Sequence, residues 1–328
     1  MQHFTYRLKE IDTDELLELS GINDSNLKYL KEIYGCDISI RNSDVLFFKE
    51  DEEEFRHFKT LMDNLLMQIK AHNPVDINMI KQLYLNINEE IDLKWQSQIA
   101  GYTASNRPIR FKTYNQYRLS DSIKHNDLVF SLGPAGTGKT FVAVLCACQA
   151  FKNGDIKKIM LTRPAVEAGE SLGFLPGDLK EKVDPYLMPL YDALYEIMGS
   201  ENVDKMLEKN QIEIIPLAYM RGRTLNDAFV ILDEAQNTTA GQMLMFLTRL
   251  GRNSKMVVNG DLSQIDLNLA RTRSGLKVAS EKLRNIKGIS FNEFDRSDVV
   301  RHPLVEKIIE NFVVDYYGKT FCGNFQRP

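Results

Sequence analysis

Hydrophobic and polar residues alternate in two different ways along the chain, and the change of pattern divides the chain in two. Near the start, Phe4, Tyr6 and Leu8 alternate with polar residues as in a half-buried strand. Further on, apolar residues recur at helical spacing or form short runs of strand length. Helices are predicted near residues 14–19, 26–33 and 55–69, and strands at 36–40 and 44–48. Residues 1–90 therefore predict a small α+β domain with the order β-α-α-β-β-α.

This order is also that of KH domains, which clamp a nucleic-acid backbone with a GXXG loop between their first two helices. Here the loop is Gly21-Ile22-Asn23-Asp24, which lacks the second glycine, and Asp24 adds a charge that repels phosphate. Two interpretations stay open for residues 1–90. The domain is either a KH-like RNA-binding module or a small packing or regulatory module.

Regular periodicity then fades, and residues 91–114 contain turn-forming residues such as Gly101, Asn106 and Pro108. We expect a connector here, with room for a hairpin. From residue 115 to 328, strand-length apolar runs alternate with helical segments. Such alternation predicts an α/β domain with a parallel sheet covered on both faces by helices. Its strands are expected at residues 127–132, 158–161, 212–215, 228–232 and 256–259.

Composition narrows the functional classes only slightly. Hydrophobic residues make up 43% and charged residues 26% of the chain, as in ordinary globular proteins. No apolar run approaches the ~18 residues of a membrane span, and no secretion signal opens the chain, so we expect a cytoplasmic protein. The net charge of −4 means that any contact with nucleic acid must be made by local groups. The four cysteines lack zinc or CxxC spacing and are expected to be buried thiols.

A glycine-rich segment follows the predicted strand 127–132, precedes a helix and fits the pattern G-x-x-x-x-G-K-[ST]. In this context backbone N–H groups would surround the β-phosphate of a nucleotide. Lys139 would contact the β- and γ-phosphates, and Thr140 would offer its hydroxyl to Mg²⁺. The predicted phosphate-binding loop consists of Gly133, Pro134, Ala135, Gly136, Thr137, Gly138, Lys139 and Thr140.

Two other predicted strands end in polar residues that would lie beside this loop. Strand 228–232 is followed by Asp233, expected to hold hydrated Mg²⁺, and by Glu234, the candidate general base for the attacking water. Strand 256–259 precedes Asp261 and Gln264. Gln264 is a candidate for sensing the γ-phosphate, with Asp261 supporting the metal shell, and a simple N-capped turn is the alternative.

Longer motifs resemble the phosphate-starvation-inducible PhoH family. They lie at residues 112–116, 133–140, 161–170, 172–178, 220–224, 231–236 and 298–304. The resemblance covers residues 112–317 and implies a RecA-like P-loop ATPase similar to the core of superfamily 1 helicases, using ATP and Mg²⁺ in an RNA-linked role. Residues 1–90 look like the KH-like region of the same family. Asn259 and Asn268 depart from the family pattern, which leaves the geometry of the loop after Gln264 open.

The resemblance also implies roles for residues outside the phosphate loop. Gln116 looks like the glutamine that recognises adenine, because its amide both donates and accepts hydrogen bonds. Arg163 stands where helicase cores contact a nucleic-acid backbone, and Arg221 and Arg223 are further candidates for RNA contacts. The alternative for these arginines is ion pairing with nearby carboxylates, namely Glu167, Glu170 or Asp178.

Arg301 precedes a predicted helix whose first turn contains Pro303. We predict that Arg301 is an arginine finger supplied to the ATP site of a neighbouring subunit, which implies a ring-shaped homo-oligomer, a hexamer. A surface arginine paired with Asp295 or Asp298, and a finger that acts in its own subunit, are the alternatives.

Together these features predict a Mg²⁺-dependent ATPase that couples hydrolysis to RNA binding or remodelling. A second helicase motor domain is not visible in the sequence, so strand separation by one subunit is difficult to picture. Two other functions stay open: a nucleotide-dependent scaffold or ribosome-associated switch, and a P-loop kinase. Glu234 argues against the kinase because it is expected to activate water.

Overall fold

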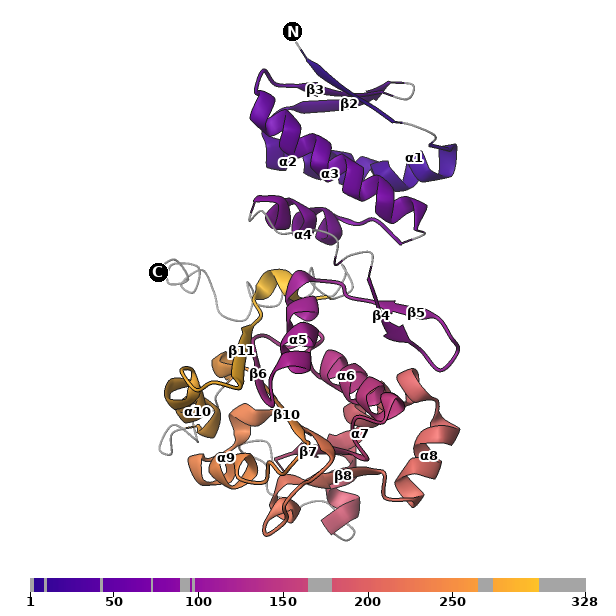
Figure 1. The fold of residues 1–328 in the computed structure, drawn as a ribbon. Coiled ribbons are helices and arrows are strands. Elements are labelled where there is room, and N and C mark those ends of the chain that lie inside the picture. The colour runs from indigo at the N-terminus through magenta and orange to yellow at the C-terminus, as the bar shows by residue number, and fades with distance from the viewer. Residues whose placement is uncertain are drawn as a thin grey trace. The chain divides into compact units, whose positions relative to one another are not determined.

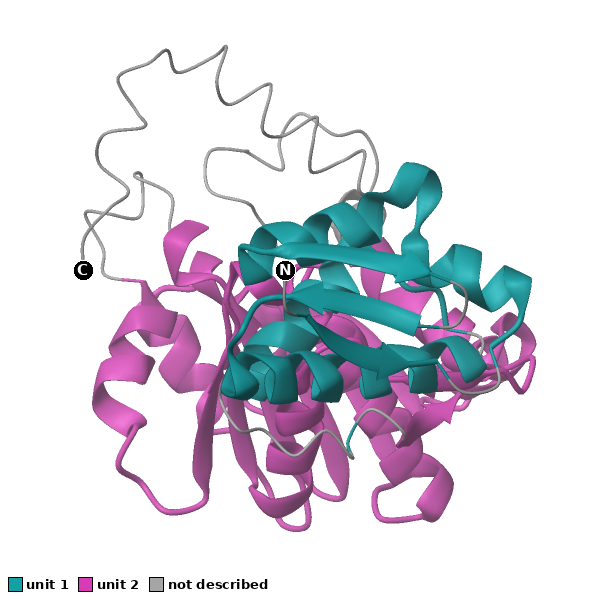
Figure 2. Cartoon of the chain, turned by 90° about the horizontal axis from the view of Figure 1, so that it is seen from above, with its two compact units in different colours: residues 1–96 teal, residues 97–328 magenta. Residues whose placement is uncertain are grey.

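The computed structural model divides the chain into two compact units, residues 1–96 and 97–328, which Figure 2 colours separately. The division falls within the predicted connector, residues 91–114. The structure describes residues 3–8, 11–41, 44–71, 73–88, 95, 98–164, 179–264 and 274–300. Within these ranges, only the backbone is described for residues 179–186.

The first unit contains a three-stranded antiparallel sheet of order β1-β3-β2. Its strands are β1 (Phe4–Arg7), β2 (Asp37–Arg41) and β3 (Asp44–Phe48), and its helices are α1 (Thr13–Ser20), α2 (Ser25–Tyr34), α3 (Glu52–Lys70) and α4 (Ile77–Asn88) (Figure 1). The predicted element order is found, with α4 added after it. The identification of this unit with a KH domain stays a prediction.

The loop between α1 and α2 adopts a fixed conformation without a second glycine. Asn23 and Asp24 both have left-handed backbones, with φ of 55° and 58°, which asparagine and aspartate tolerate better than most residues. The buried side chain of Asn26 donates to the carbonyl oxygens of Glu18 (3.2 Å) and Val75 (3.0 Å). These hydrogen bonds tie the start of α2 to α1 and to the segment before α4.

The second unit contains a six-stranded sheet of order β11-β6-β10-β9-β7-β8, in which every neighbouring pair is parallel. The predicted parallel sheet is therefore confirmed, and β11 is an additional strand. Strand β10 lies between β6 and β9, the strands that precede the glycine-rich loop and Asp233. The strands are β6 (Leu128–Leu132), β7 (Lys158–Arg163), β8 (Ile212–Pro216), β9 (Ala228–Leu232), β10 (Lys255–Gly260) and β11 (Ile289–Glu293).

Helices cover both faces of this sheet (Figure 1). One face packs against α5 (Tyr114–His125), α6 (Lys139–Asn153), α7 (Leu179–Met198) and α8 (Ser200–Glu208). The other packs against α9 (Ala240–Leu247) and α10 (Gly275–Leu283). Burial on both faces explains why the central strands are almost continuously apolar. Strands β4 (Ile99–Tyr102) and β5 (Pro108–Arg110) form an antiparallel hairpin before α5.

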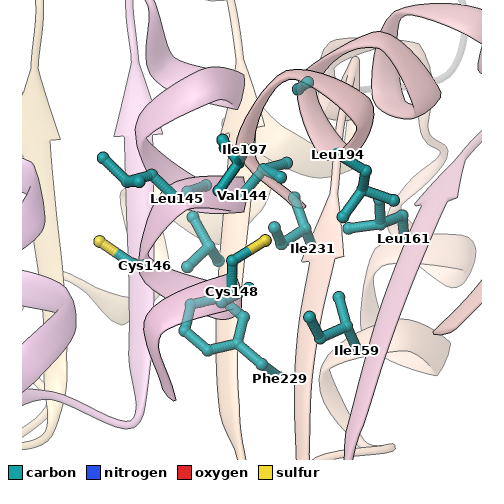
Figure 3. Close-up of a cluster of buried hydrophobic side chains, with 14 of the residues drawn as sticks. Val144, Leu145, Cys146, Cys148, Ile159, Leu161, Leu194, Ile197, Phe229 and Ile231 are labelled. Carbon is teal, nitrogen blue, oxygen red and sulfur yellow. The ribbon is translucent and has the colours of Figure 1, made fainter. Parts of the chain in front are cut away.

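Helix α6 is held on the sheet by a buried hydrophobic cluster (Figure 3). Its Val144 and Cys148 side chains lie in the same cluster as Phe229 and Ile231 of β9. Burial raises the pKa of the Cys148 thiol to about 12, so this cysteine packs as an apolar group. Because α6 begins at the glycine-rich loop, this packing fixes the position of the loop. Among the helices that the structure describes, none has the length and hydrophobicity needed to cross a bilayer.

Candidate active site

The glycine-rich loop joins the end of β6 to the first residue of α6. Gly133 (φ 144°) and Gly138 (φ 79°) have backbone conformations that favour glycine. A Cβ atom on Gly133 would lie 2.4 Å from the carbonyl oxygen of Phe294, and one on Gly138 would lie 2.7 Å from Nε2 of Gln116. The loop therefore requires glycine at both positions. Gly138 provides no side-chain cap for α6, and an uncapped helix N-terminus after a glycine-rich loop is the arrangement that binds phosphate.

Lys139 folds back over this loop. Its ammonium group donates to the carbonyl oxygens of Gly133 (2.7 Å) and Pro134 (2.6 Å). Burial lowers the pKa of Lys139, and four nearby carboxylates oppose this effect: Asp261, Asp233, Glu234 and Asp298. Phosphate oxygens are stronger acceptors than these carbonyls, so a bound nucleotide could take over the contacts of Lys139.

Thr140 and Asp233 lie together, as the predicted metal ligands should. The Thr140 hydroxyl donates to Oδ1 of Asp233 over 2.8 Å, and the Asp233 side chain is only 4% exposed. A hydroxyl and a carboxylate are oxygen ligands of the kind that Mg²⁺ prefers. Within the described part of the chain, no three His, Cys, Asp or Glu side chains could hold a metal by themselves. A Mg²⁺ ion here would therefore need oxygens from water and a nucleotide as well.

Arg163 at the end of β7 contacts the other oxygen of Asp233. Its Nε and Nη2 atoms donate to Oδ2 over 2.9 Å and 2.5 Å, and Nη2 lies 3.8 Å from Oε1 of Glu234. Strand β7 pairs directly with β9, which brings Arg163 beside the end of β9. Asp233 is 70 positions from Arg163 in the chain, so this pairing was not predicted from the sequence. An RNA contact at Arg163 stays a prediction.

Glu234, the candidate base, is held by a residue that the sequence analysis did not single out. Gln236 donates from Nε2 to Oε2 of Glu234 over 2.6 Å, and its Oε1 accepts from the backbone N–H of Asp261 over 3.1 Å. Gln236 is buried and joins the ends of β9 and β10. Glu234 has a left-handed backbone (φ 53°), and its side chain remains 39% exposed and thus accessible to water. In the sequence, Gln236 could have been found as a site residue from its place at the end of the motif 231–236.

The segment after β10 forms a capped turn. Asp261 accepts at Oδ1 from the N–H (2.9 Å) and the hydroxyl (2.6 Å) of Ser263, as the alternative interpretation of this segment expected. The side chain of Gln264 is exposed, so its role as a sensor of the γ-phosphate stays a prediction. Asn268 lies outside the described residues.

Asn259 is an unusual buried residue one position before the end of β10. Neither its amide nitrogen nor its amide oxygen has a hydrogen-bond partner among the residues that the structure describes. Alternation along β10 puts Asn259 on the same face as Val257, the face covered by α6. An unpaired buried polar group costs about 1–3 kcal/mol, so its presence near the phosphate loop calls for a partner such as a water molecule.

Gln116, the candidate adenine reader, lies directly beside the phosphate loop. It is in the first turn of α5, where Thr113 caps the helix by accepting from the N–H of Gln116. Its Nε2 donates to the carbonyl oxygen of Thr137 over 3.0 Å, and its Oε1 accepts from the N–H of Lys112 over 2.9 Å. Recognition of adenine by this amide therefore requires at least one of these contacts to change, and it stays a prediction.

The chain before Arg301 also contacts the phosphate loop. The N–H of Val300 donates to the carbonyl oxygen of Gly136 over 3.0 Å. The buried carboxylate of Asp298 accepts from Nδ2 of Asn115 on α5 over 2.8 Å. Arg301 lies outside the described residues, so the arginine finger stays a prediction.

The two other candidate RNA contacts lie near β8. Arg223 donates from Nη1 (2.8 Å) and Nη2 (3.1 Å) to the carboxylate of Glu213, which Lys158 also contacts over 2.5 Å. Burial favours a raised pKa for Glu213, but these two cations outweigh it and lower the pKa. Arg221 is exposed. An ion pair thus exists at Arg223, with a partner on strand β8, whereas Glu167, Glu170 and Asp178 lie outside the described residues.

Comparison with known proteins identifies the family. Residues 108–313 match the family described as PhoH-like protein. The chain belongs to the PhoH-like protein family. The PhoH-like protein of Bacillus subtilis (strain 168) is 52% identical over 303 residues, which cover 91% of this chain and 94% of the relative. That of Synechocystis sp. is 41% identical, with 95% of each chain covered. Protein PhoH of Escherichia coli (strain K12) is 42% identical over 62% of this chain and 58% of its own length.

Two solved structures are similar to the PhoH-like chain at low TM-scores. The SWI2/SNF2 ATPase core of Sulfolobus solfataricus in complex with dsDNA has a TM-score of 0.35 and 15% identity, over 62% of this chain and 51% of that chain. The Pif1 helicase of Candida albicans has a TM-score of 0.32 and 14% identity, over 62% of this chain and 43% of the helicase chain. Such scores carry no functional argument. The RecA-like P-loop NTPase fold, predicted from the sequence, is instead supported by the parallel sheet, the phosphate loop and the family.

Proposed function

We propose that this PhoH-like protein binds ATP and hydrolyses it with Mg²⁺. The observation that carries the proposal is the convergence of three groups at the carboxyl edge of the sheet. The Thr140 hydroxyl and the Asp233 carboxylate are hydrogen-bonded over 2.8 Å, and Glu234 follows directly with its carboxylate fixed by Gln236. Thr140 and Asp233 would hold hydrated Mg²⁺, which neutralises charge on the phosphates when bound.

The protein's own residues account for the remaining steps. The N–H groups at the start of α6 and the ammonium group of Lys139 bind and orient the phosphates. Glu234 accepts a proton from the attacking water as the water oxygen bonds to the γ-phosphorus. The bond between the γ-phosphorus and the bridging oxygen then breaks, and ADP and inorganic phosphate leave. Gln236 keeps the Glu234 carboxylate oriented towards this water.

The test is phosphate release from ATP, measured for wild type with Mg²⁺ and with EDTA, and for two variants. Glu234→Gln is expected to bind the nucleotide but to lose about 10²- to 10⁴-fold in turnover. Lys139→Ala is expected to weaken nucleotide binding itself, because it removes a contact to the ground-state phosphates. Substantial turnover by Glu234→Gln would exclude it as the base, and binding without turnover in wild type would favour a scaffold or switch.

Coupling of hydrolysis to RNA is the second part of the proposal. It is supported by the resemblance of the motifs to helicase cores and by Arg221, which is exposed in the segment between β8 and β9. The test is the ATPase rate with and without defined single-stranded RNA. Stimulation supports an RNA-dependent motor, and an unchanged rate contradicts it. A hexameric ring remains part of the proposal and is tested by sedimentation with and without nucleotide.

A further inference from the structure

The carboxylate of Asp233 is shared between two partners on opposite oxygens. Oδ1 accepts from the Thr140 hydroxyl, and Oδ2 accepts from Nε and Nη2 of Arg163. The side chains of Arg163 and Asp233 are 15% and 4% exposed, so water screens this ion pair only weakly. Arg163 is therefore built into the proposed metal site and is poorly exposed for contact with a macromolecule.

The charges explain why a cation is needed at this position. Asp233 and Glu234 are adjacent carboxylates, and removing a cation that is hydrogen-bonded to a buried carboxylate leaves that charge poorly compensated, which is costly. Lys139 is directed at the loop carbonyls, whereas Arg163 reaches both carboxylates, with Nη2 3.8 Å from Oε1 of Glu234. Arg163 is thus a described cation in direct contact with this pair, while Lys139 adds charge from nearby.

A hydrated Mg²⁺ at Asp233 would add two positive charges beside that guanidinium. Two cations that share one carboxylate repel each other, so Arg163 and the metal oppose each other's binding at Asp233. Glu234 offers Arg163 a second partner within a small side-chain movement. The carboxylate that loses the guanidinium then gains the metal.

We propose that Arg163 is a positioning residue that occupies the metal-binding carboxylate before Mg²⁺ arrives and shifts towards Glu234 when Asp233 takes the metal. This inference rests on the proposed function, since it concerns the metal of the same site. The role of Arg163 is to occupy Asp233 until the metal binds there. In this proposal the guanidinium would compete with nucleotide-bound metal for Asp233, so metal affinity would be lower than the value that Thr140 and Asp233 alone would give.

Arg223 provides a matched control in the same sheet. It also pairs with a carboxylate on a neighbouring strand, through two contacts to Glu213, and its side chain is 35% exposed. Glu213 is on β8, at the edge of the sheet, whereas Asp233 follows the interior strand β9. Arg223→Ala removes an arginine ion pair without touching the proposed metal ligands.

The test titrates Mn²⁺, followed by its electron paramagnetic resonance signal, into protein saturated with a non-hydrolysable ATP analogue. Arg163→Ala is expected to tighten Mn²⁺ binding about tenfold, the factor for loss of one competing charge-assisted contact, whereas Arg223→Ala leaves it unchanged. Without ligand, Arg163→Ala lowers the Tm, and this loss shrinks when Mn²⁺ and the analogue are bound. If Arg163→Ala does not fold, Arg163→Gln keeps a donor to Asp233, removes the charge and is expected to tighten binding in the same direction.

Three results would overturn the inference. If Arg163→Ala leaves the Mn²⁺ affinity unchanged and lowers the Tm equally with and without ligand, the ion pair between Arg163 and Asp233 is structural only. Weaker Mn²⁺ binding means that Arg163 assists the metal and does not compete with it. Unchanged Mn²⁺ affinity with reduced RNA affinity and a smaller salt slope assigns Arg163 to RNA. The non-hydrolysable analogue makes these results independent of turnover, so absence of phosphate release refutes the ATPase proposal separately.

Discussion

Gln236 makes the candidate site testable because its two hydrogen bonds can be separated by substitution. Gln236→Ala removes both the donor to Glu234 and the acceptor for the N–H of Asp261. Gln236→Glu has nearly the same shape and keeps an acceptor for Asp261. It loses the donor and brings a second carboxylate against Glu234. The two variants should therefore differ in stability but agree in turnover.

The magnitudes follow from the contacts. A hydrogen bond to a charged group contributes about 1.5–3 kcal/mol, and a buried donor left without an acceptor costs about 1–3 kcal/mol. Gln236→Ala incurs both losses, so we expect it to destabilise the protein by about 2.5–6 kcal/mol. Gln236→Glu keeps the contact to Asp261, and its cost is instead that of a second carboxylate buried against Glu234. Turnover should fall in both because Glu234 is no longer held. A drop of about tenfold or more is expected, below the 10²- to 10⁴-fold contribution typical of a whole general base.

The assay combines kcat at saturating ATP and Mg²⁺ with thermal unfolding. Gln242→Ala is a matched control on α9: its Oε1 accepts from the N–H of Thr239 at the exposed start of the helix. Loss of that cap is expected to cost about 1 kcal/mol and leave kcat unchanged. A normal kcat in Gln236→Glu would refute the reasoning, because it would mean that orientation of Glu234 by Gln236 has no part in hydrolysis.

Three further predictions concern the other candidate residues. Gln116→Ala should relax the preference for ATP over GTP in competition binding, and an unchanged ratio means that adenine is recognised elsewhere. Arg221→Ala should weaken RNA binding and reduce the salt slope by about 1, whereas RNA affinity that ignores salt contradicts a backbone contact. Arg301→Ala should lower turnover about 10³-fold with ATP binding retained. Its activity should recover on mixing with Lys139→Ala subunits if the finger acts in trans, and recovery fails if it acts in cis.

Sequence patterns predicted the features that depend on nearby residues. The phosphate loop is recognisable because its glycines, Lys139 and Thr140 are consecutive and follow an apolar strand. The strand before Asp233 is recognisable in the same way. The parallel sheet follows from the alternation of strands and helices, which is a property of the whole segment.

The contacts that orient the site could not be predicted because they depend on strand order. The pairing of Arg163 with Asp233 exists because β7 lies beside β9, although the two residues are 70 positions apart. The bridge from Gln236 to Asp261 likewise requires β10 to lie next to β9. Arg223 pairs with Glu213 on β8, only ten positions earlier, a partner that nothing in the sequence pattern gave a reason to choose.

The phosphate loop is also the point at which distant segments of the chain meet. Gln116 contacts the carbonyl oxygen of Thr137, and the N–H of Val300 contacts that of Gly136, one residue away in the loop. Asn115 and Asp298 join the same two segments to each other. A shift of the loop on nucleotide binding must therefore alter α5 and the chain at 298–300 together. The segment before Arg301 is thus fixed on the phosphate loop of its own subunit. An arginine finger acting in cis is compatible with this contact, so recovery of activity on mixing the two variants is the result that would assign the finger to a neighbouring subunit instead.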